Sequence, residues 1–456
     1  MKTIFIPIYF RMQARNILRT GTYRTLIADD TVRVVIFVPP FKLEEYRKEF
    51  AAPNVLFEGV AEPPSFFSRL DAFFDHLSLF YLSTPTGRFF RKQWILREHH
   101  RPLRYAFSMV VLSIIGTIPL LQRLGRWLDY QLVRESWYAP YFEKYKPDVI
   151  FAPHIISKVE RSLLRQAKRR GVRTVGMINS WDNITLGKYP FRLLSDKLIV
   201  HNELIKNEAV KYLHYHPENI FIAGMPHFDH YVTNARIGRE EFCTRFGIDP
   251  RKRIVLFTSI SSALNPTEWQ VLSMLTAAIE DGRLPKDLIL LVRHHPVSNM
   301  LVGDLKPSPH LIFDNSKTLF ERGKTYSEIL RSDMEHLANS LYHAELIITT
   351  ASTTSIDAAA FDKPSVNLAF DGWEKPPFHR SVRRFYEPSH DHYQAIVKSG
   401  GVRIVYSFDD LVKNIVAYLA DSSRDREGRA RIIREQCYKL DGKAGERVGE
   451  YLLSQA

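Results

Sequence analysis

Cysteine is nearly absent from this 456-residue chain, which contains only Cys243 and Cys437. Two cysteines argue against a disulfide framework, and the sequence has no HExxH pattern and no Cys/His cluster at metal-ligand spacing. The N-terminal apolar run over residues 3–10 is too short for the core of a signal peptide and has no basic stretch before it. We therefore expect a protein of the reduced cytosol that works without a bound metal or other cofactor.

Acidic residues are scarce in the first half of the chain. Residues 1–232 contain 33 Lys+Arg against 21 Asp+Glu, whereas residues 233–456 contain 30 against 29, so nearly all of the net charge of +13 lies in the first half. An anionic partner should therefore bind there. Zinc-finger spacing, RNA-binding signatures and basic-region heptads are missing, and the basic residues alternate with apolar stretches. This pattern favours an anionic membrane surface over nucleic acid.

The composition, 45% hydrophobic and 25% charged, is that of a folded protein, and the length favours two domains. Strand-like and helix-like runs alternate, which is typical of parallel sheets with crossover helices. The predicted strands are 2–9, 32–38, 54–60, 148–152, 173–178, 197–201 and 219–223, then 254–258, 287–293, 311–313, 345–349 and 365–369. We expect an α/β fold with two doubly wound domains, 1–232 and 233–422, and a C-terminal helical segment, 423–456, that braces the first domain.

One stretch, residues 62–143, interrupts the strand pattern and should form a helical insertion in the first domain. Its aromatic and leucine residues from 66 to 80 recur at helical spacing, which predicts an amphipathic helix with an aromatic face. Residues 105–122 carry no charge over 18 positions, close to the minimum for a membrane span. A span, a buried helical hairpin and a membrane-surface helix all stay open. Six basic residues precede this run as candidates for membrane docking: Arg88, Arg91, Lys92, Arg97, Arg101 and Arg104.

A run of hydroxyl residues, Ser352, Thr353 and Thr354, follows the predicted strand 345–349 and begins a helix. Unpaired backbone N–H groups at a helix N-terminus attract anions, and small hydroxyl side chains add donors while leaving room for a phosphate. Ser and Thr also serve as ordinary helix caps. Because the run continues into Ser355, it exceeds what a cap requires and favours phosphate binding.

Three basic residues, Arg293, His294 and His295, end an apolar strand and are followed by Pro296. Ligands of open α/β sheets bind outside the carboxyl ends of the strands, so these residues are well placed to meet a phosphate. Arg and His side chains can also stabilise the charge that develops on a phosphate leaving group.

Two further loops follow predicted strands. Gly224, Pro226 and Asp229 lie just before the expected domain boundary and are candidates for an interdomain hinge, although Gly and Pro at a strand end usually mean only a turn. Asp182 lies in the polar loop after strand 173–178. Its carboxylate could accept a proton from an attacking hydroxyl, or it could simply form an Asx turn.

Taken together, these motifs resemble the GT-B fold, in which two Rossmann-like domains face a cleft, and specifically bacterial surface-glycan transferases that use nucleotide-activated donors. Arg293-His294-His295-Pro296 is similar to the His-Pro motif of the sialyl, polysialyl and Kdo transferases and of the CDP-glycerol glycerophosphotransferases. The Ser352 run, with its downstream Asp-Ala and Lys-Pro elements, is similar to their Ser/Thr phosphate motif. The Gly224 loop resembles a Gly-x-Pro-x-x-Asp element that is shared with UDP-GlcNAc 2-epimerases.

The resemblance implies roles for particular residues. The second domain would bind the donor nucleotide, with His295 and the Ser352 run on its phosphate and Asp357 near the ribose. His392 and Tyr393 are expected on the nucleotide side. The catalytic base of related transferases is an acid of the first domain, and Asp182 is the candidate by its position alone.

We therefore expect an inverting, metal-independent glycosyltransferase at the inner face of a cell membrane. It would move a sugar from a CMP-, CDP- or UDP-linked donor to a glycan or lipid-linked acceptor. Three alternatives stay open: a CDP-glycerol-type polyol-phosphate transferase, a UDP-GlcNAc 2-epimerase-like enzyme, and a non-catalytic scaffold that docks on membranes.

Overall fold

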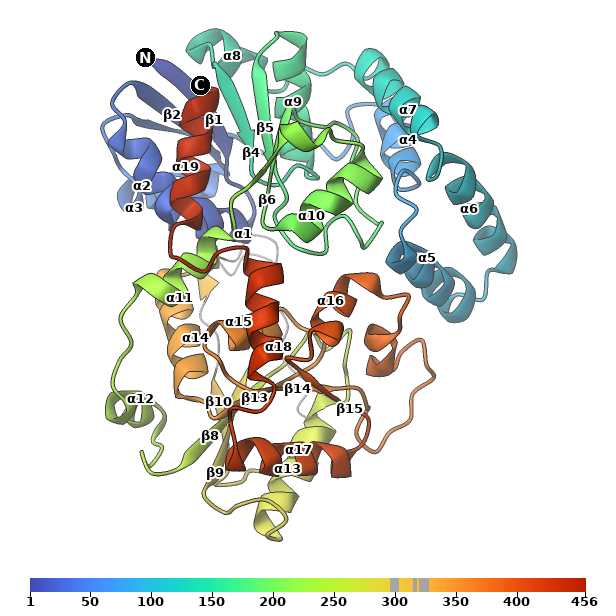
Figure 1. Cartoon of the computed structure of the whole chain (residues 1–456). Helices are drawn as coiled ribbons and strands as arrows, with labels where there is room; N and C mark the ends of the chain where they lie inside the picture. The colour runs from blue at the N-terminus through green and yellow to red at the C-terminus, as the bar shows by residue number, and fades with distance from the viewer. Residues whose placement is uncertain (296–302, 315–317, 320–327) are drawn as a thin grey trace. The chain divides into compact units, whose positions relative to one another are not determined.

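The computed structural model describes residues 1–295, 303–314, 318–319 and 328–456, and divides the chain into two compact units (Figure 1). Unit 1 contains Met1–Asp229 and Cys437–Ala456, and unit 2 contains His230–Gln436. These limits differ from the expected ones at 232 and 422. The reason is that residues 423–436 stay with unit 2, where α18 (Arg426–Ile432) packs against α15 (Thr354–Ala360) and α16 (Asp391–Ser399).

The core of unit 1 is a parallel sheet of seven strands in the order β3-β2-β1-β4-β5-β6-β7. Its strands are rich in Val, Ile and Phe and are largely buried, as expected where helices cover both faces of a parallel sheet. The strands are β1 (Lys2–Pro7), β2 (Val32–Val38), β3 (Val55–Gly59), β4 (Val149–Ala152), β5 (Arg173–Met177), β6 (Lys197–Val200) and β7 (Ile220–Ile222).

The helices of unit 1 are of two kinds. Those that connect sheet strands or return from the C-terminus are α1 (Arg11–Gln13), α2 (Gly21–Ala28), α3 (Leu43–Glu49), α8 (Ala139–Tyr145), α9 (Lys158–Arg169), α10 (Glu203–Glu208) and α19 (Ala444–Gln455). Those of the predicted insertion are α4 (Arg69–Ser78), α5 (Pro85–Arg91), α6 (Pro102–Ile115) and α7 (Pro119–Leu132), with a π-helix, η3 (Lys92–Glu98), between α5 and α6.

Unit 2 repeats the design with six parallel strands in the order β10-β9-β8-β13-β14-β15. The strands are β8 (Arg253–Thr258), β9 (Leu288–Arg293), β10 (Leu311–Asp314), β13 (Leu346–Thr349), β14 (Ser365–Leu368) and β15 (Arg403–Val405). A separate antiparallel pair joins β11 (Thr318–Leu319) to β12 (Glu328–Ile329). The remaining helices are α11 (Asp229–Thr233), α12 (Arg239–Phe246), α13 (Glu268–Glu280), α14 (Arg331–His343) and α17 (Phe408–Ala420). The α/β alternation predicted from the sequence is thus confirmed, and the sequence pattern missed β15 and the short strands β11 and β12.

The Gly224 loop fixes the end of the chain to unit 1. Gly224 has a φ of +85°, and a Cβ there would lie 3.1 Å from the Cβ of Ala444, so the loop needs glycine at this point. The carboxylate of Asp229 accepts hydrogen bonds from the backbone N–H groups of Ala444 (2.9 Å) and Gly445 (2.7 Å). Asp229 therefore caps the first turn of α19, which lies beside α2 (Figure 1). The loop that was predicted as a hinge, with Pro226 buried within it, is an anchor for the returning helix.

The insertion is attached to the sheet by buried charges. Arg192, whose side chain is fully buried, forms ion pairs with Asp71 of α4 (2.7 Å) and Asp129 of α7 (2.7 Å). Arg165 of α9 contacts the same Asp129 at 2.8 Å, and Arg161 reaches Asp75 at 2.6 Å. The inner sides of α4 and α7 are thus acidic. Leu70 and Phe73 of α4, and Phe66 just before it, belong to the predicted aromatic face and are exposed at the surface.

The six basic residues predicted to dock on a membrane do not behave alike. Arg91 is turned inward: it donates to the carbonyl of Leu79, lies 4.6 Å from the Phe80 ring centroid, and burial lowers its pKa. Arg91 is therefore a structural residue. Arg88 is exposed and donates to the Ser83 hydroxyl at 2.9 Å. The other four are exposed and have no carboxylate partner in the part of the chain that the structure describes: Lys92, Arg97, Arg101 and Arg104.

Candidate functional site

The strand order of each sheet reverses at one point, and this is where ligands bind in open α/β folds. In unit 2 the reversal lies between β8 and β13, whose carboxyl ends are Thr258 and Thr349. The two ends are joined directly, since the Thr349 hydroxyl donates to the Thr258 carbonyl at 3.3 Å. The hydroxyl run at 352–354 begins immediately beyond this point.

The loop before α15 combines a strained backbone with several hydroxyl side chains. Ala351 has a positive φ of 37°, a strained value for a residue with a Cβ, and its N–H donates to the Tyr386 hydroxyl at 2.9 Å. The Ser352 hydroxyl accepts from the N–H of Thr354 (3.2 Å) and lies 3.1 Å from the Thr354 hydroxyl. The N–H of Ser352 is hydrogen-bonded to the buried Tyr393 hydroxyl, whereas the N–H of Thr353 has no acceptor among the described residues. One free amide beside two hydroxyls forms a cradle that could hold an anion.

The histidines at the end of β9 lie beside this reversal point. His295 donates its backbone N–H to the Ser259 hydroxyl (3.0 Å), and Ser259 in turn donates to the Arg293 carbonyl (3.2 Å). The ends of β8 and β9 are thus tied together. The ring of His294 stacks on Phe313 with centroids 5.3 Å apart, and burial lowers its pKa. Pro296, the last residue of the predicted motif, lies outside the described residues.

Arg293 does not take part in the cradle as expected. Its buried guanidinium donates to Asp314 (2.9 Å) and to Asp333 (2.6 Å), two carboxylates that are themselves buried. Burial alone would raise the pKa of Asp314, but hydrogen bonds from His336 and Arg293 hold it below its usual value. With its charge matched by two carboxylates, Arg293 fixes the end of β9 and has little left to offer a phosphate.

Three other residues of unit 2 were predicted to belong to the donor site, and two of them are buried. Tyr393 is fully buried, and its hydroxyl donates to Asn367 (2.8 Å) and lies 2.9 Å from the Ser355 hydroxyl. It therefore holds α15 against β14, which corrects its assignment to the nucleotide. Asp357 is buried in α15 and accepts from the Tyr231 hydroxyl at 3.0 Å, so it too serves the packing of unit 2. His392, on α16, is half-buried and packs edge-on against His390.

Several buried acids of unit 2 were not predicted from the sequence, and Glu268 is one of them. Glu268, at the start of α13, accepts from the backbone N–H of Ile260 at 3.1 Å, and burial raises its pKa well above the usual value. Burial thus disfavours its charged form, and its hydrogen bond fixes the loop that follows β8. Nothing in the sequence distinguishes it from the many glutamates that occupy first helical turns.

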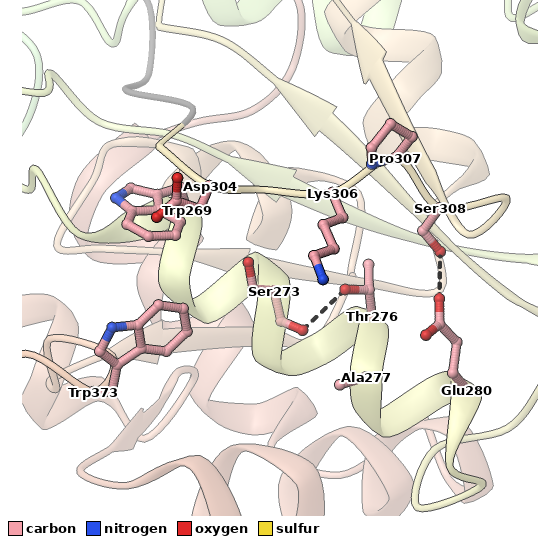
Figure 2. A pocket seen from close by; sticks show the side chains of 10 residues that line it. All are labelled: Trp269, Ser273, Thr276, Ala277, Glu280, Asp304, Lys306, Pro307, Ser308 and Trp373. Carbon is pink, nitrogen blue, oxygen red and sulfur yellow. Dashed lines mark hydrogen bonds between the residues drawn. The ribbon is translucent and has the colours of Figure 1, made fainter.

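A groove with a volume of about 370 Å³ runs along α13 (Figure 2). Trp269 and Trp373 meet edge to face at one end with centroids 5.2 Å apart, and Lys306 reaches toward Ser273 and Thr276. At the other end the Ser308 hydroxyl donates to Glu280 at 3.0 Å. None of the predicted donor-site residues is among the described residues that line it, so the groove is separate from the cradle.

In unit 1, Asp182 lies in a loop that is held from several sides. Asn16 donates to the Asn179 side chain at 3.1 Å, and the Thr84 hydroxyl donates to the Thr185 carbonyl at 2.6 Å. Within this loop the Asn183 side chain accepts from the Ser180 N–H at 3.1 Å. The half-buried carboxylate of Asp182 makes no ion pair and no hydrogen bond with the described residues. A rigid loop thus presents an unneutralised carboxylate beyond the end of β5, as a general base requires.

The reversal point of unit 1, between β1 and β4, contains polar groups that the sequence did not single out as a set. Gln13 accepts the N–H groups of Tyr9 (2.7 Å) and Phe10 (2.8 Å) and donates to the buried Glu160. Burial raises the pKa of Glu160 well above its usual value, whereas burial lowers the pKa of His154 to about 4. Burial thus disfavours the charged form of both groups, and this edge of the sheet is lined by buried polar side chains.

No metal-ligating cluster is apparent in the described ranges, where no group of three or more His, Cys, Asp or Glu side chains is arranged to hold an ion. The same residues include no single helix that is long and apolar enough to cross a bilayer. Only α6 and α7 together reach that length and composition, and they are bent by 94° at the break between them.

Comparison with known proteins identifies relatives at the level of sequence family and fold. The model of the family described as CDP-Glycerol:Poly(glycerophosphate) glycerophosphotransferase matches residues 192–454, more than half of the chain. No curated protein matches the sequence.

Among solved structures, UDP-GlcNAc 2-epimerase from Neisseria meningitidis bound to UDP-GlcNAc is similar with a TM-score of 0.55 and 13% identity over 100% of both chains. MnaA from S. aureus, solved with UDP, is similar with a TM-score of 0.53 and 13% identity over 100% of this chain and 98% of the MnaA chain. A glycosyltransferase from Rickettsia africae is similar with a TM-score of 0.50 and 11% identity over 100% of this chain and 99% of the other. At these identities the likeness concerns the fold alone, and it confirms the predicted α/β GT-B architecture of two Rossmann-like domains.

Proposed function

The chain belongs to the CDP-glycerol:poly(glycerophosphate) glycerophosphotransferase family, and on that premise we propose that it moves a polyol phosphate from a CDP-linked donor to a hydroxyl of a cell-surface polymer. The observation that carries the proposal is the family match itself, which extends through unit 2 and into α19. The enzyme is a transferase for cell-surface glycans, as the sequence motifs predicted. The family match supports a polyol-phosphate donor, which was an alternative at the sequence level, over a sugar donor.

Unit 2 supplies the donor site in this proposal. The N–H group of Thr353, with the hydroxyls of Ser352 and Thr354 beside it, would hold the diphosphate of the donor. His295, on the neighbouring strand end, would stabilise the negative charge that grows on the departing CMP. Each hydrogen-bond donor of this type contributes on the order of 3 kcal/mol to transition-state stabilisation.

Unit 1 supplies the base. As the acceptor oxygen attacks the β-phosphorus of the donor, its proton passes to the carboxylate of Asp182. The new P–O bond forms while the bond between the β-phosphorus and the bridging oxygen breaks, and CMP leaves with the electron pair. The products are a phosphodiester on the acceptor, CMP and protonated Asp182, which then returns its proton to water.

Sugar transfer is the second candidate, and it is favoured by the likeness to proteins that were solved with UDP-GlcNAc or UDP. The same cradle and base would serve it, since the acceptor oxygen would then attack an anomeric carbon with inversion and release the nucleotide. In both cases the partners are a nucleotide-activated donor and a glycan or lipid-linked acceptor.

The test is product analysis with purified protein. CDP-glycerol, CDP-ribitol, UDP-GlcNAc and CMP-linked sugars are incubated separately, with and without a poly(glycerophosphate) acceptor, and the released nucleotide is resolved by chromatography. Acceptor-dependent release of CMP from a CDP-polyol supports the proposal. Acceptor-dependent turnover of a nucleotide sugar alone would contradict it in favour of glycosyl transfer. Conversion of UDP-GlcNAc without any acceptor would indicate an epimerase, and a protein that neither binds nor turns over any donor would be a scaffold.

A further inference from the structure

One side of α13 lines the groove that Figure 2 shows. The residues on this side recur at helical spacing, and they are Trp269, Ser273, Thr276 and Glu280. The other side of the helix packs on the core of unit 2 through buried aliphatic residues: Val271, Leu272, Leu275, Ala278 and Ile279. Helix α13 therefore presents to the groove an aromatic ring, two hydroxyls and a carboxylate, which suit hydrogen bonding to a polar ligand.

The second tryptophan of the groove, Trp373, is exposed but fixed in position. The side chain of Gln270, which is fully buried, accepts from the backbone N–H groups of Trp373 (3.1 Å) and Glu374 (3.1 Å) and donates to the Glu374 carboxylate (2.6 Å). Gly372 has a φ of +66°, and a Cβ there would lie 2.7 Å from the Gln270 Cβ. The backbone that carries Trp373 is thus held against α13, while 52% of this residue stays exposed.

Trp269 is the inner of the two rings. It packs on the core of unit 2 and meets Trp373 with the ring planes at 90°. Gly303 approaches it so closely that a Cβ on this glycine would lie 2.4 Å from the Trp269 Cε2 atom. The exposed surface of Trp373 is therefore the aromatic surface that is left for a ligand. Because its backbone is already held, a ligand that packs on it would lose little affinity to ordering the protein.

The groove has little net charge. Among the described residues that line it, Lys306 is the one basic residue, and Asp304 and Glu280 are acidic. A nucleoside diphosphate or a polymer of glycerol phosphate would meet two carboxylates and one ammonium group, which disfavours binding of an anion. The groove is therefore complementary to an uncharged ligand with many hydroxyl groups.

A sugar ring combines the two properties that this groove recognises. One face of a pyranose presents C–H groups, which pack against an aromatic ring because the ring face is slightly negative and the C–H groups are slightly positive. The edges of the sugar ring carry hydroxyls that both donate and accept hydrogen bonds. The volume of about 370 Å³ is in the range of small-molecule sites.

From this geometry we infer that the groove along α13 binds a neutral pyranose unit of a glycan, with the C–H face of the sugar on Trp373 and its hydroxyls on Ser273 and Glu280. The inference goes beyond the proposed transfer reaction and does not depend on which donor is used. Such a site would keep the enzyme on a sugar-containing polymer while the cradle holds the donor. A nucleotide base would also stack on Trp373, but its phosphates would lie among the acids of the groove.

The first experiment is saturation-transfer NMR on the full-length protein with cellobiose and with chitobiose, two neutral disaccharides. Each is used at about 10 mM, where a site with a dissociation constant of about 1 mM is mostly occupied. Both should receive saturation, most strongly at their ring C–H protons. Sorbitol is the control ligand and should receive little, because it has the hydroxyls of a sugar but no ring face. Saturating CDP should not displace the disaccharides, since the cradle and the groove share no residue.

Variants assign the signal to the groove. Trp373→Ala should weaken disaccharide binding roughly tenfold, whereas Trp373→Phe should keep most of it because an aromatic face remains. Trp127→Ala is the matched control, since Trp127 lies on α7 in unit 1 and is 55% exposed, close to the 52% of Trp373. Ser273→Ala should weaken binding about threefold through the loss of one hydrogen bond. It changes only a hydroxyl, so it keeps the test decisive if Trp373→Ala lowers the melting temperature.

Lys306→Gln tests whether the ligand is neutral. Disaccharide binding should stay within about twofold of the parent protein and should be equal at low and high salt, because no ion pair is involved. A tenfold loss in this variant, together with weaker binding at high salt, would assign the groove to an anion and overturn the inference. So would the absence of saturation on both disaccharides, equal saturation of sorbitol, unchanged binding by Trp373→Ala, or displacement by CDP, which would place the sugar in the donor site.

Discussion

Unit 1 and unit 2 are built on the same strand order through six strands, yet they differ at the reversal point of the sheet. In unit 2 this point presents the N–H group of Thr353, the hydroxyls at 352–354 and His295. In unit 1 it is lined by Glu160 and His154, whose charged forms are disfavoured by burial, and Asp182, which makes no ion pair with the described residues, lies one strand further along. The shared scaffold positions these residues, while the residue types at the strand ends decide the chemistry.

The second difference is the insertion. Unit 1 carries α4 to α7 between β3 and β4, in a stretch, residues 69–132, that has nine Lys+Arg against four Asp+Glu. The described part of unit 2 shows no comparable bent helical pair. Under the proposed function, unit 2 would hold the small anionic donor and unit 1 would supply the base that acts on the acceptor.

A buried arginine can be substituted in each unit, Arg293 in unit 2 and Arg192 in unit 1, to test whether buried ion pairs stabilise the fold of both. Arg293→Met in unit 2 removes the guanidinium shared by Asp314 and Asp333, and Arg192→Met in unit 1 removes the one shared by Asp71 and Asp129, although Asp129 keeps Arg165 and Asp314 keeps His336. We expect each variant to lose about 3 to 5 kcal/mol of unfolding free energy, measured by denaturant titration. A loss of nucleotide binding by Arg293→Met at unchanged stability would instead return Arg293 to the donor site.

Substitutions in the cradle should lower the turnover of the enzyme and leave its free energy of unfolding unchanged. Ser352→Ala and His295→Ala are each expected to lower turnover by about 10² to 10³, because each removes stabilisation of the departing phosphate. Both should also reduce the thermal shift that the cognate nucleotide produces. Ser273→Ala, in the groove along α13, is the matched control and should leave turnover and thermal shift unchanged. If the control variant were the one to lose the shift, the nucleotide would bind in the groove.

Unit 1 should be the more acid-sensitive of the two. His201, at the end of β6, is 1% exposed, and burial lowers its pKa to about 4, as it does for His154. The unfolded chain binds a proton at each site near pH 6.5, so stability is complete above that pH and is lost as the pH falls toward 4. Each histidine should cost roughly 3 kcal/mol over this window. His201→Gln should remove about half of the slope in unfolding free energy, and an unchanged slope would contradict the assignment.

The smallest expected effect concerns the anchor of the C-terminal helix. Asp229→Ala removes the acceptor of two backbone N–H groups at the start of α19, which should cost about 1 to 2 kcal/mol. Hydrogen exchange should show faster exchange of the amides of α19 with little change in unit 2. Uniformly faster exchange in both units would mean that Asp229 supports more than this helix.

The sequence was sufficient for features that depend on local pattern. Alternation of strands and helices predicted both sheets, and the hydroxyl run at 352–354 correctly identified the end of a sheet strand. The sequence was insufficient where the interaction partner of a side chain lies far along the chain. Arg293 was assigned to a phosphate because its partner Asp333 lies forty positions away, and nothing local indicated that Asp71 of α4 pairs with Arg192, which follows more than a hundred residues later. Tyr393 was misplaced for the same reason, since Asn367 and Ser355 occupy its hydroxyl.

The most direct test of the division of labour between the units is a paired measurement on Asp182→Asn. Calorimetric titration gives the affinity for the donor, and release of CMP from CDP-glycerol in the presence of poly(glycerophosphate) gives the turnover. We expect donor affinity equal to that of the parent protein and turnover lower by about 10² to 10⁴, because only the general base is lost. Turnover within a few-fold of the parent, or loss of donor affinity, would contradict the assignment of the base to unit 1 and the donor to unit 2.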